Sequence, residues 1–214
     1  MSNNPVFKKV LLKNIEVQYP KIDRTYRWNS DEQRSEPCAP TAAGASWSIG
    51  WTMSHEDAKA LFNELKDHYN ACKALDPKLP EFSKVFGMKK LDNSLVAFSA
   101  KKNGVTRKGD PNKAPMVIGM DGNDLSEADR AIWGGSTCTL RAQAFPTKSP
   151  QGEGGISLLL DAVQVVEGVY GGGGADMDDF DIKPKAAVSD DPFGLPETKA
   201  APARNDDLED EIPF

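Results

Sequence analysis

The sequence predicts a mainly β protein, a Greek-key barrel with one inserted α-helix, followed by a disordered acidic C-terminal tail. Three observations support this fold class. Several short segments carry strand patterns, one long segment carries a helix pattern, and the composition changes abruptly at Gly171. The folded domain is therefore expected to cover residues 1–170, and the tail residues 171–214.

Six segments have the composition of strands and are separated by Gly, Pro, Asn and Asp clusters that favour turns. They cover residues 6–19, 45–53, 94–102, 115–120, 136–145 and 155–169. In the second segment, Trp47, Ile49 and Trp51 alternate with small residues, which is the period of a half-buried strand. Because such a strand turns its apolar face inward, Trp47 and Trp51 are predicted to be core residues.

One long helix is predicted after the second strand. Ser54 and Asp57 have the spacing of a capping box, and Asp76-Pro77 would end the helix. Apolar residues recur between them at helical spacing: Ala58, Leu61, Phe62, Leu65, Tyr69 and Cys72. A second, shorter helix is predicted over residues 125–133. An immunoglobulin-like sandwich would not usually hold so long a helix, so a barrel is favoured, and the OB-fold is the small nucleic-acid-binding example.

Charge is distributed unevenly along the chain. The whole chain has 26 Lys and Arg against 32 Asp and Glu, a net charge of −6. The tail holds 12 acidic and 4 basic residues (net −8), which leaves 20 acidic and 22 basic residues (net +2) in the folded domain. The tail begins with four glycines and is rich in Pro, Asp, Ala and Ser, so it cannot bury enough apolar surface to fold. The acidity belongs to the tail, and the domain is mildly basic.

Several kinds of protein and site are excluded by missing motifs. No apolar run approaches the ~20 residues of a membrane helix, and the N-terminus lacks the apolar core of a signal peptide, so a cytoplasmic protein is expected. Three widely spaced cysteines predict reduced thiols and not a disulfide framework or zinc site. Residues 121–124 do not match a calcium loop and residues 152–155 do not match a phosphate loop, so both segments are predicted to be turns. Residues 176–187 do not match a calcium loop either. His55 and His68 fall on the predicted helix, so no enzyme, cofactor or metal site is expected.

Positive charge is concentrated in residues 84–113, which have eight basic and two acidic residues, a net charge of +6. We expect residues 94–120 to form a β-hairpin with a loop at 103–114. Its edge and loop would carry Lys101, Lys102, Arg107 and Lys108. Such an edge would attract a phosphate backbone. The alternative is a solvated loop whose lysines only maintain solubility.

Aromatic residues outside apolar runs are candidates for base stacking. Tyr26, Arg27 and Trp28 stand together in polar surroundings, and Trp133 precedes two glycines. In the strand 136–145, alternation puts Cys138, Leu140, Ala142 and Ala144 on the core face, and Thr139, Arg141, Gln143 and Phe145 on the other. That second face is either a nucleic-acid surface or an ordinary solvent face. The candidate nucleic-acid-binding residues are Tyr26, Arg27, Trp28, Lys101, Lys102, Arg107, Lys108, Trp133, Arg141 and Phe145.

The last nine residues combine five acids with an apolar end. This composition fits a short ligand, with negative charge for a basic rim and a terminal ring for an apolar pocket. The candidate partner-binding residues are Asp206, Asp207, Glu209, Asp210, Glu211, Ile212, Pro213 and Phe214.

The ending Ile212-Pro213-Phe214 after aspartates resembles the acidic tip of bacterial single-stranded-DNA-binding proteins. Residues 5–170 resemble the bacteriophage single-stranded-DNA-binding family, an OB-fold with an inserted helix, through residues 131–136, the strand to Phe145-Pro146, and residues 155–164. The resemblance implies sequence-independent binding of single strands in replication, recombination and repair. It also implies a tail that recruits replication or recombination proteins, and a location in the host cytoplasm if the chain is phage-encoded.

A flexible tail of this length has an r.m.s. reach of ~35–40 Å, comparable with the ~40 Å width expected for the folded domain. The tip is therefore expected to compete with DNA for a groove bordered by the predicted basic hairpin. The alternative function is a β-barrel interaction adaptor that docks on replication enzymes through its tail without binding DNA itself. Both functions are compatible with a homo-oligomer.

Overall fold

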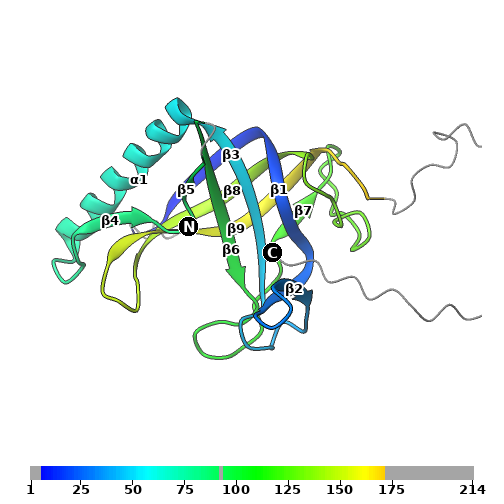
Figure 1. Ribbon diagram of the computed structural model, residues 1–214, viewed down its shortest axis with the longest axis horizontal. Coiled ribbons are helices and arrows are strands. Elements are labelled where there is room, and N and C mark those ends of the chain that lie inside the picture. The colour runs from blue at the N-terminus through cyan, green and yellow to red at the C-terminus, as the bar shows by residue number, and fades with distance from the viewer. Residues whose placement is uncertain (1–5, 92–93, 172–214) are drawn as a thin grey trace, which may run out of the picture. The chain divides into compact units, whose positions relative to one another are not determined.

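The computed structural model describes residues 6–91 and 94–171, which contain one helix and nine strands (Figure 1). In chain order the elements are β1 (Lys8–Asn29), β2 (Arg34–Pro37), β3 (Ser46–Ser54), α1 (His55–Leu75), β4 (Phe82–Val85), β5 (Lys89–Lys90), β6 (Leu95–Asn103), β7 (Met116–Ile118), β8 (Thr137–Lys148) and β9 (Gly154–Glu167). The chain divides into two units, Met1–Gly172 and Gly173–Phe214, and the first is described here.

Five strands close into a barrel in the order β1, β3, β6, β9, β8 and back to β1. All of these pairs are antiparallel except β6 with β9, which is parallel and closes the barrel at Lys101 and Leu159. A five-stranded Greek-key barrel is the OB-fold architecture, so the predicted fold class is confirmed. Because the helix follows β3, it is inserted between the second and third barrel strands.

The first strand is longer than the predicted segment 6–19, because it continues past Pro20 to Asn29. The backbone φ is positive at Asn14 and Tyr19, and the pairing register with β3 shifts between Gln18 and Lys21. Pro is tolerated in a strand at such a bulge, where its missing N–H interrupts no regular ladder. These bends allow β1 to pair with β8 along its first half and with β3 along its second half.

The barrel interior is filled from the faces that strand alternation predicts. Trp47, Ile49 and Trp51 of β3 are buried, which confirms that both tryptophans are core residues. Phe98 of β6 stacks on Trp51, with ring centroids 5.8 Å apart. The predicted core face of β8 is also confirmed: Cys138, Leu140, Ala142 and Ala144 are all buried.

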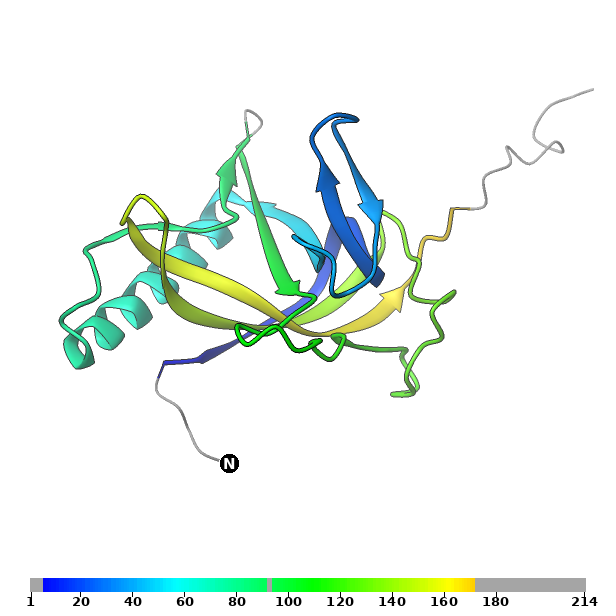
Figure 2. The ribbon, with the colours of Figure 1, turned by 90° about the horizontal axis from the view of Figure 1, so that it is seen from below.

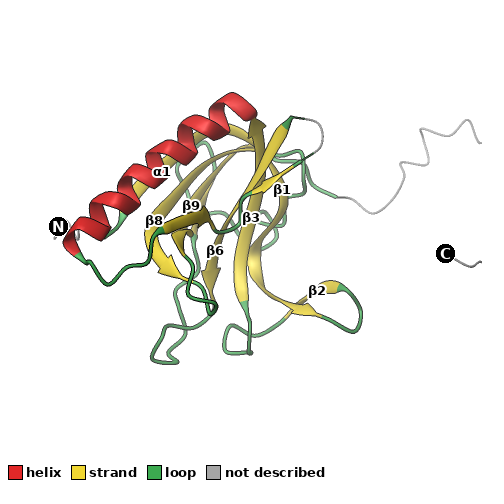
Figure 3. Ribbon diagram, turned by 60° about the vertical axis from the view of Figure 1, so that its left-hand side comes forward, coloured by secondary structure: helices red, strands yellow, loops and turns green. Residues whose placement is uncertain are grey.

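The long helix is confirmed as α1. The Ser54 hydroxyl accepts a hydrogen bond from the Asp57 N–H (3.1 Å), and the helix ends before Asp76. Ala58, Leu61, Leu65, Tyr69 and Cys72 form its buried face. Figure 3 shows α1 lying across the barrel at the end remote from β2.

The prediction of a second helix over 125–133 is wrong. Residues 126–130 make a single turn, in which the Arg130 N–H bonds to the Ser126 carbonyl at 3.0 Å. The chain then leaves the helical path, because buried Ile132 makes a β-bridge with Tyr170. Tertiary pairing outweighs the local helical preference here.

The predicted hairpin over 94–120 is also wrong. β6 pairs with β3 over nine positions, whereas β7 pairs in parallel with β9. The intervening residues fold on themselves, since the Asn112 N–H bonds to the Gly104 carbonyl at 2.7 Å. Gly104 is required at this point, because a Cβ there would lie 2.1 Å from the Pro40 carbonyl oxygen. The short strands β2, β4 and β5 have no counterpart among the predicted segments.

The remaining local predictions concern turns and thiols. An Asx turn is confirmed at Asp121, whose Oδ1 accepts a hydrogen bond from the Asn123 N–H at 3.0 Å. The predicted turn at 152–155 is confirmed only in part: residues 149–153 connect β8 to β9, but Gly154 and Gly155 begin β9 because they pair with Lys148 and Thr147. Cys38, Cys72 and Cys138 are reduced thiols that form no disulfide with one another, and Cys72 Sγ lies 3.7 Å from His68 Nε2. The aspartate run 176–187 and the tip 206–214 lie outside the described residues. Within the described part of the chain, no helix is long and apolar enough to cross a membrane.

Candidate nucleic-acid interface

Four of the predicted residues, Tyr26, Arg27, Trp28 and Lys101, line one groove of about 360 Å³ on the outer face of β1, β3 and β6. We call it the Trp28 groove. Its other lining residues are Lys21, Ser35, Ala43, Gly44, Ser46 and Ser48. Strand alternation explains the grouping, because the tryptophans of β3 point inward and its serines face this groove.

The β1–β2 hairpin presents the aromatic wall of the Trp28 groove. It projects from the barrel in Figure 2 (blue), and β2 pairs with the end of β1 so that Trp28 lies opposite Ser35. The Trp28 side chain is 60% exposed, which leaves its ring available to a ligand. Arg27 has only a distant ionic partner, with its Nη2 3.9 Å from Glu36 Oε2.

Lys21 brings a cation to the same groove. Its ammonium lies 5.8 Å from the centroid of the Tyr26 ring and also donates a hydrogen bond to the Ser35 hydroxyl. Partial burial lowers the pKa of Lys21. A phosphate placed beside this ammonium would restore the favourable surroundings that burial removes.

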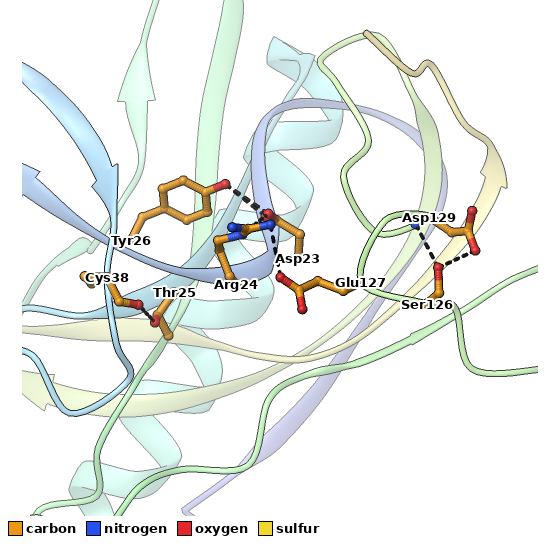
Figure 4. A network of polar contacts seen from close by, with 8 residues as sticks. All are labelled: Asp23, Arg24, Thr25, Tyr26, Cys38, Ser126, Glu127 and Asp129. Atoms are coloured by element: carbon orange, nitrogen blue, oxygen red, sulfur yellow. Dashed lines mark hydrogen bonds and ion pairs between the residues drawn. The ribbon is translucent and has the colours of Figure 1, made fainter. Parts of the chain in front are cut away.

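A polar network fixes Tyr26 (Figure 4). Its hydroxyl donates to the Asp23 carboxylate, whose oxygens are both 3.1 Å away, and Arg24 Nε contacts the same carboxylate at 2.9 Å. Arg24 also reaches Glu127 (3.0 Å), which ties the 126–130 turn to β1. Burial, followed by the charge of Asp23, raises the pKa of Tyr26 to about 12, so the phenol is a neutral donor at physiological pH.

Trp133 lies in an adjoining groove of about 680 Å³, here called the Trp133 groove, whose wall includes Tyr26. The backbone N–H of Trp133 donates to the Val169 carbonyl at 2.7 Å. The indole ring packs on Gly171, where a Cβ would lie only 2.0 Å from Trp133 Cε2. The side chain remains 58% exposed. Tyr26 therefore joins two grooves that each carry an exposed tryptophan.

The two grooves differ in charge. The Trp28 groove is lined by Lys21, Arg27 and Lys101, and no acidic side chain is among its lining residues. The lining of the Trp133 groove includes Glu16 and Asp23 and no lysine or arginine. Phosphates are therefore favoured in the Trp28 groove, whereas the Trp133 groove offers aromatic surface for a base.

Two adjacent lysines that were predicted to bind DNA lie on opposite faces of β6. Lys101 pairs with Ser48 and lies in the Trp28 groove, whereas Lys102 pairs with buried Trp47. Burial lowers the pKa of Lys102, and its charged neighbours are Asp161, which raises this pKa, and Lys113, which lowers it. Lys101 is thus the lysine of this pair in the Trp28 groove.

Arg141 lies on the outer face of β8, as predicted, but it has an ionic partner. Its Nε is 2.7 Å from Asp161 Oδ2, and both side chains are partly exposed. A phosphate at this position would have to compete with the Asp161 carboxylate.

Phe145 and Arg107 line a third groove of about 420 Å³, here called the Phe145 groove. Phe7 joins them, with its ring centroid 5.7 Å from that of Phe145. Lys108 is exposed in the same loop as Arg107, and its N–H donates to the Thr106 hydroxyl at 3.2 Å.

Comparison with solved structures identifies proteins of similar fold. The single-stranded DNA-binding protein from bacteriophage Enc34 is 18% identical, with a TM-score of 0.52 over 80% of this chain and 88% of that one. Its complex with single-stranded DNA gives 17% identity and a TM-score of 0.53 over 77% and 89% of the two chains. The single-stranded DNA-binding protein gp2.5 of bacteriophage T7 is 16% identical, with a TM-score of 0.53 over 86% and 99%.

The chain has the fold of these bacteriophage single-stranded-DNA-binding proteins. No family model and no curated protein matches the sequence. The similarity is therefore detected in the tertiary structure and not in the sequence. Candidate DNA-binding residues are assigned from the grooves of this chain.

Sequence reasoning did not identify three residues of this barrel as groove residues. Tyr19, the last residue of the predicted first strand, is strongly exposed and lines the Trp133 groove. Lys21 lies two residues further along β1 and lines the Trp28 groove. Phe7 lies just before β1 and lines the Phe145 groove. A lysine next to an aromatic cluster was an available signal for Lys21, but Phe7 stands in an apolar run, where a core residue is the ordinary expectation.

Proposed function

We propose that this chain binds single-stranded DNA without sequence preference. The observation that carries the proposal is the Trp28 groove, which brings exposed Trp28, the Tyr26 ring and the cations of Lys21, Arg27 and Lys101 together on one face of an OB barrel. This is the OB-fold face that binds oligonucleotides in other proteins. The solved complex of the Enc34 protein with single-stranded DNA supports the same ligand for this fold.

The mechanism proposed for this face combines stacking with charge neutralisation. Each base stacked on an aromatic ring contributes ~1–3 kcal/mol and every base has a π-face, so the contact tolerates any sequence. Lysine and arginine side chains neutralise phosphates and release counterions, which makes the affinity salt-dependent. Stacking by Trp28 and Trp133 on either side of Tyr26 would hold successive bases of one strand.

We further propose that the protein is not an enzyme. Its two histidines both lie on α1, and neither lines a groove of the proposed DNA-binding face. His68 Nε2 lies 3.3 Å from the Val6 carbonyl, and His55 is in the first turn of the helix. The aromatic and basic residues of the Trp28 groove suit binding rather than proton transfer.

The proposed function is tested by titrating the chain with fluorescent oligo(dT) and with duplex of equal length, while following tryptophan fluorescence. We expect tight single-strand binding that quenches exposed Trp28 and Trp133, and much weaker binding of the duplex. If four phosphates are contacted, the logarithm of the affinity should fall with the logarithm of salt at a slope of about −3, at ~0.7 per contact. Absence of single-strand binding would refute the proposal and leave the interaction adaptor.

For the tail we propose two roles. Its acidic tip, residues 206–214, would recruit replication or recombination proteins. Because the tip carries five acids, it would also compete with DNA for the basic Trp28 groove. The chain would then act in replication, recombination and repair. Deletion of residues 206–214 is expected to raise the affinity for single strands at low salt. An unchanged or lower affinity would contradict the competition.

A further inference from the structure

We propose that the Phe145 groove is a separate nucleobase pocket, reached only by strands long enough to continue beyond the Trp28 groove. This inference rests on the proposed single-strand binding and specifies the path of the strand. The groove is lined by Val6, Phe7, Asn103, Val105, Thr106, Arg107, Asn112, Phe145, Pro146 and Leu159.

The chemistry of the lining suits one nucleotide. Phe7 and Phe145 are tilted by 43° with centroids 5.7 Å apart, so a base stacked on one ring meets the edge of the other. Phe7 is 44% exposed, which is unusual for a phenylalanine and leaves stacking surface open. Arg107 supplies a cation for the phosphate. The Asn112 amide lies beside the apolar walls, where its Nδ2 donates to the Asn103 carbonyl at 3.0 Å.

The barrel connects this pocket to the Trp28 groove. Lys101 lines the Trp28 groove, Leu159 lines the Phe145 groove, and the two residues are register partners where β6 meets β9. Partners in a parallel pair point to the same face, so both side chains lie on the outer surface. Tyr26 on β1 and Leu159 on β9 are separated by three strand spacings, or about 15 Å. A strand bound at Trp28 therefore needs additional nucleotides to reach Phe145.

The charge along this path is positive. Lys101 lies at the β6–β9 seam, and the loop after β6 carries Arg107, Lys108 and Lys113 against one acidic residue, Asp110. Asp161 lies further along β9 and is engaged by Arg141. The seam therefore favours continuation of a phosphate backbone toward Phe7 and Phe145.

The test compares oligo(dT) strands of about 4 and about 20 nucleotides, at the lower end and beyond the upper end of the ~4–16 nucleotides that one OB-fold covers. At ~3.4 Å per stacked nucleotide, the short strand spans about 10 Å, so when it is bound at Trp28 it does not cross the ~15 Å to Leu159. Binding to the full chain is measured by fluorescence anisotropy for Phe145→Leu and Phe7→Leu. We expect each variant to bind the long strand at least about fivefold more weakly, the loss of one stacked base. The affinity for the short strand should be unchanged.

The chain offers a matched control. Phe62 of α1 and Phe82 of β4 also form an aromatic pair, at 5.6 Å, on the helix side of the barrel. Phe62→Leu should change neither affinity, and urea unfolding of all variants separates lost binding from lost stability. Equal losses for both strands, or no loss for the long strand, would overturn the separate pocket. Failure of the unmodified chain to bind either strand would instead refute the proposed function.

Discussion

The four tryptophans form two pairs in opposite environments. Trp47 and Trp51 on β3 are 4% and 1% exposed, whereas Trp28 and Trp133 are 60% and 58% exposed. The buried pair lies in an alternating strand with an isoleucine between its members, whereas Trp28 stands in a polar stretch and Trp133 precedes two glycines. The same type of side chain therefore fills the core in one place and offers a stacking surface in another, according to the residues around it.

The largest expected effect concerns the buried pair. Trp51→Ala would remove a ring stacked on Phe98 and leave a cavity, so the free energy of unfolding should fall by about 3–5 kcal/mol. Urea unfolding measures this loss. The affinity of the remaining folded protein for single strands should be unchanged, and a loss of only a few tenths of a kcal/mol would show that Trp51 is not a core residue.

The exposed pair should behave in the reverse way. Trp28→Ala is expected to weaken single-strand binding by about 1–3 kcal/mol, because a stacking surface is lost. Stability should change by less than ~0.5 kcal/mol, since the side chain is exposed. Leu75→Ala, which alters an exposed apolar residue at the end of α1, is the control and should change neither quantity. A stability loss in Trp28→Ala without a binding loss would reverse the assignment of the two pairs.

The pH dependence of the free energy of unfolding tests the burial of Cys138. Burial raises the pKa of the Cys138 thiol to about 12, from an ordinary value of 9.0. The unfolded chain ionises this thiol first, so its contribution to stability is complete below pH 9 and is lost as pH rises toward 12. The slope is at most ~1.4 kcal/mol per pH unit for one group.

Unfolding of Cys138→Ala measured from pH 8 to 11 should show a shallower decline than the unmodified chain. Burial should also slow the reaction of the Cys138 thiol. In the native chain, half-buried Cys38 should react with a thiol reagent before Cys138. Reaction of Cys138 at the rate of Cys38 would contradict its burial.

The smallest effect distinguishes the neighbours Lys101 and Lys102. Lys101→Gln should reduce the salt slope of single-strand binding by about 0.7, the value for one phosphate contact. Lys102→Gln should reduce it less, because Lys102 is partly buried, with Asp161 among its charged neighbours. Affinities at several salt concentrations supply the slopes, and equal reductions would place both lysines on the DNA.

The fold was largely predictable because its signals are local. Alternation in β3 and β8, the cap at Ser54 and the apolar stripe of α1 each depend on residues within a few positions of one another. The failures occurred where distant segments compete for pairing. Ile132 pairs with Tyr170 instead of ending a helix, and β7 pairs with β9 instead of β6.

In the candidate site, too, local patterns were predictable and long-range pairing was not. Alternation in β3 predicts the burial of Trp47 and Trp51, and the polar neighbours of Trp28 make it a candidate for exposure, whereas the apolar neighbour Ile132 leaves the exposure of Trp133 to the fold. The grouping into three grooves depends on long-range strand pairing, which sets Lys101 beside Trp28, closes the β6–β9 seam at Leu159 and brings Phe7 to Phe145. Alternation assigns a residue to a face, but barrel closure decides which faces meet, because it depends on pairing between strands far apart in the chain.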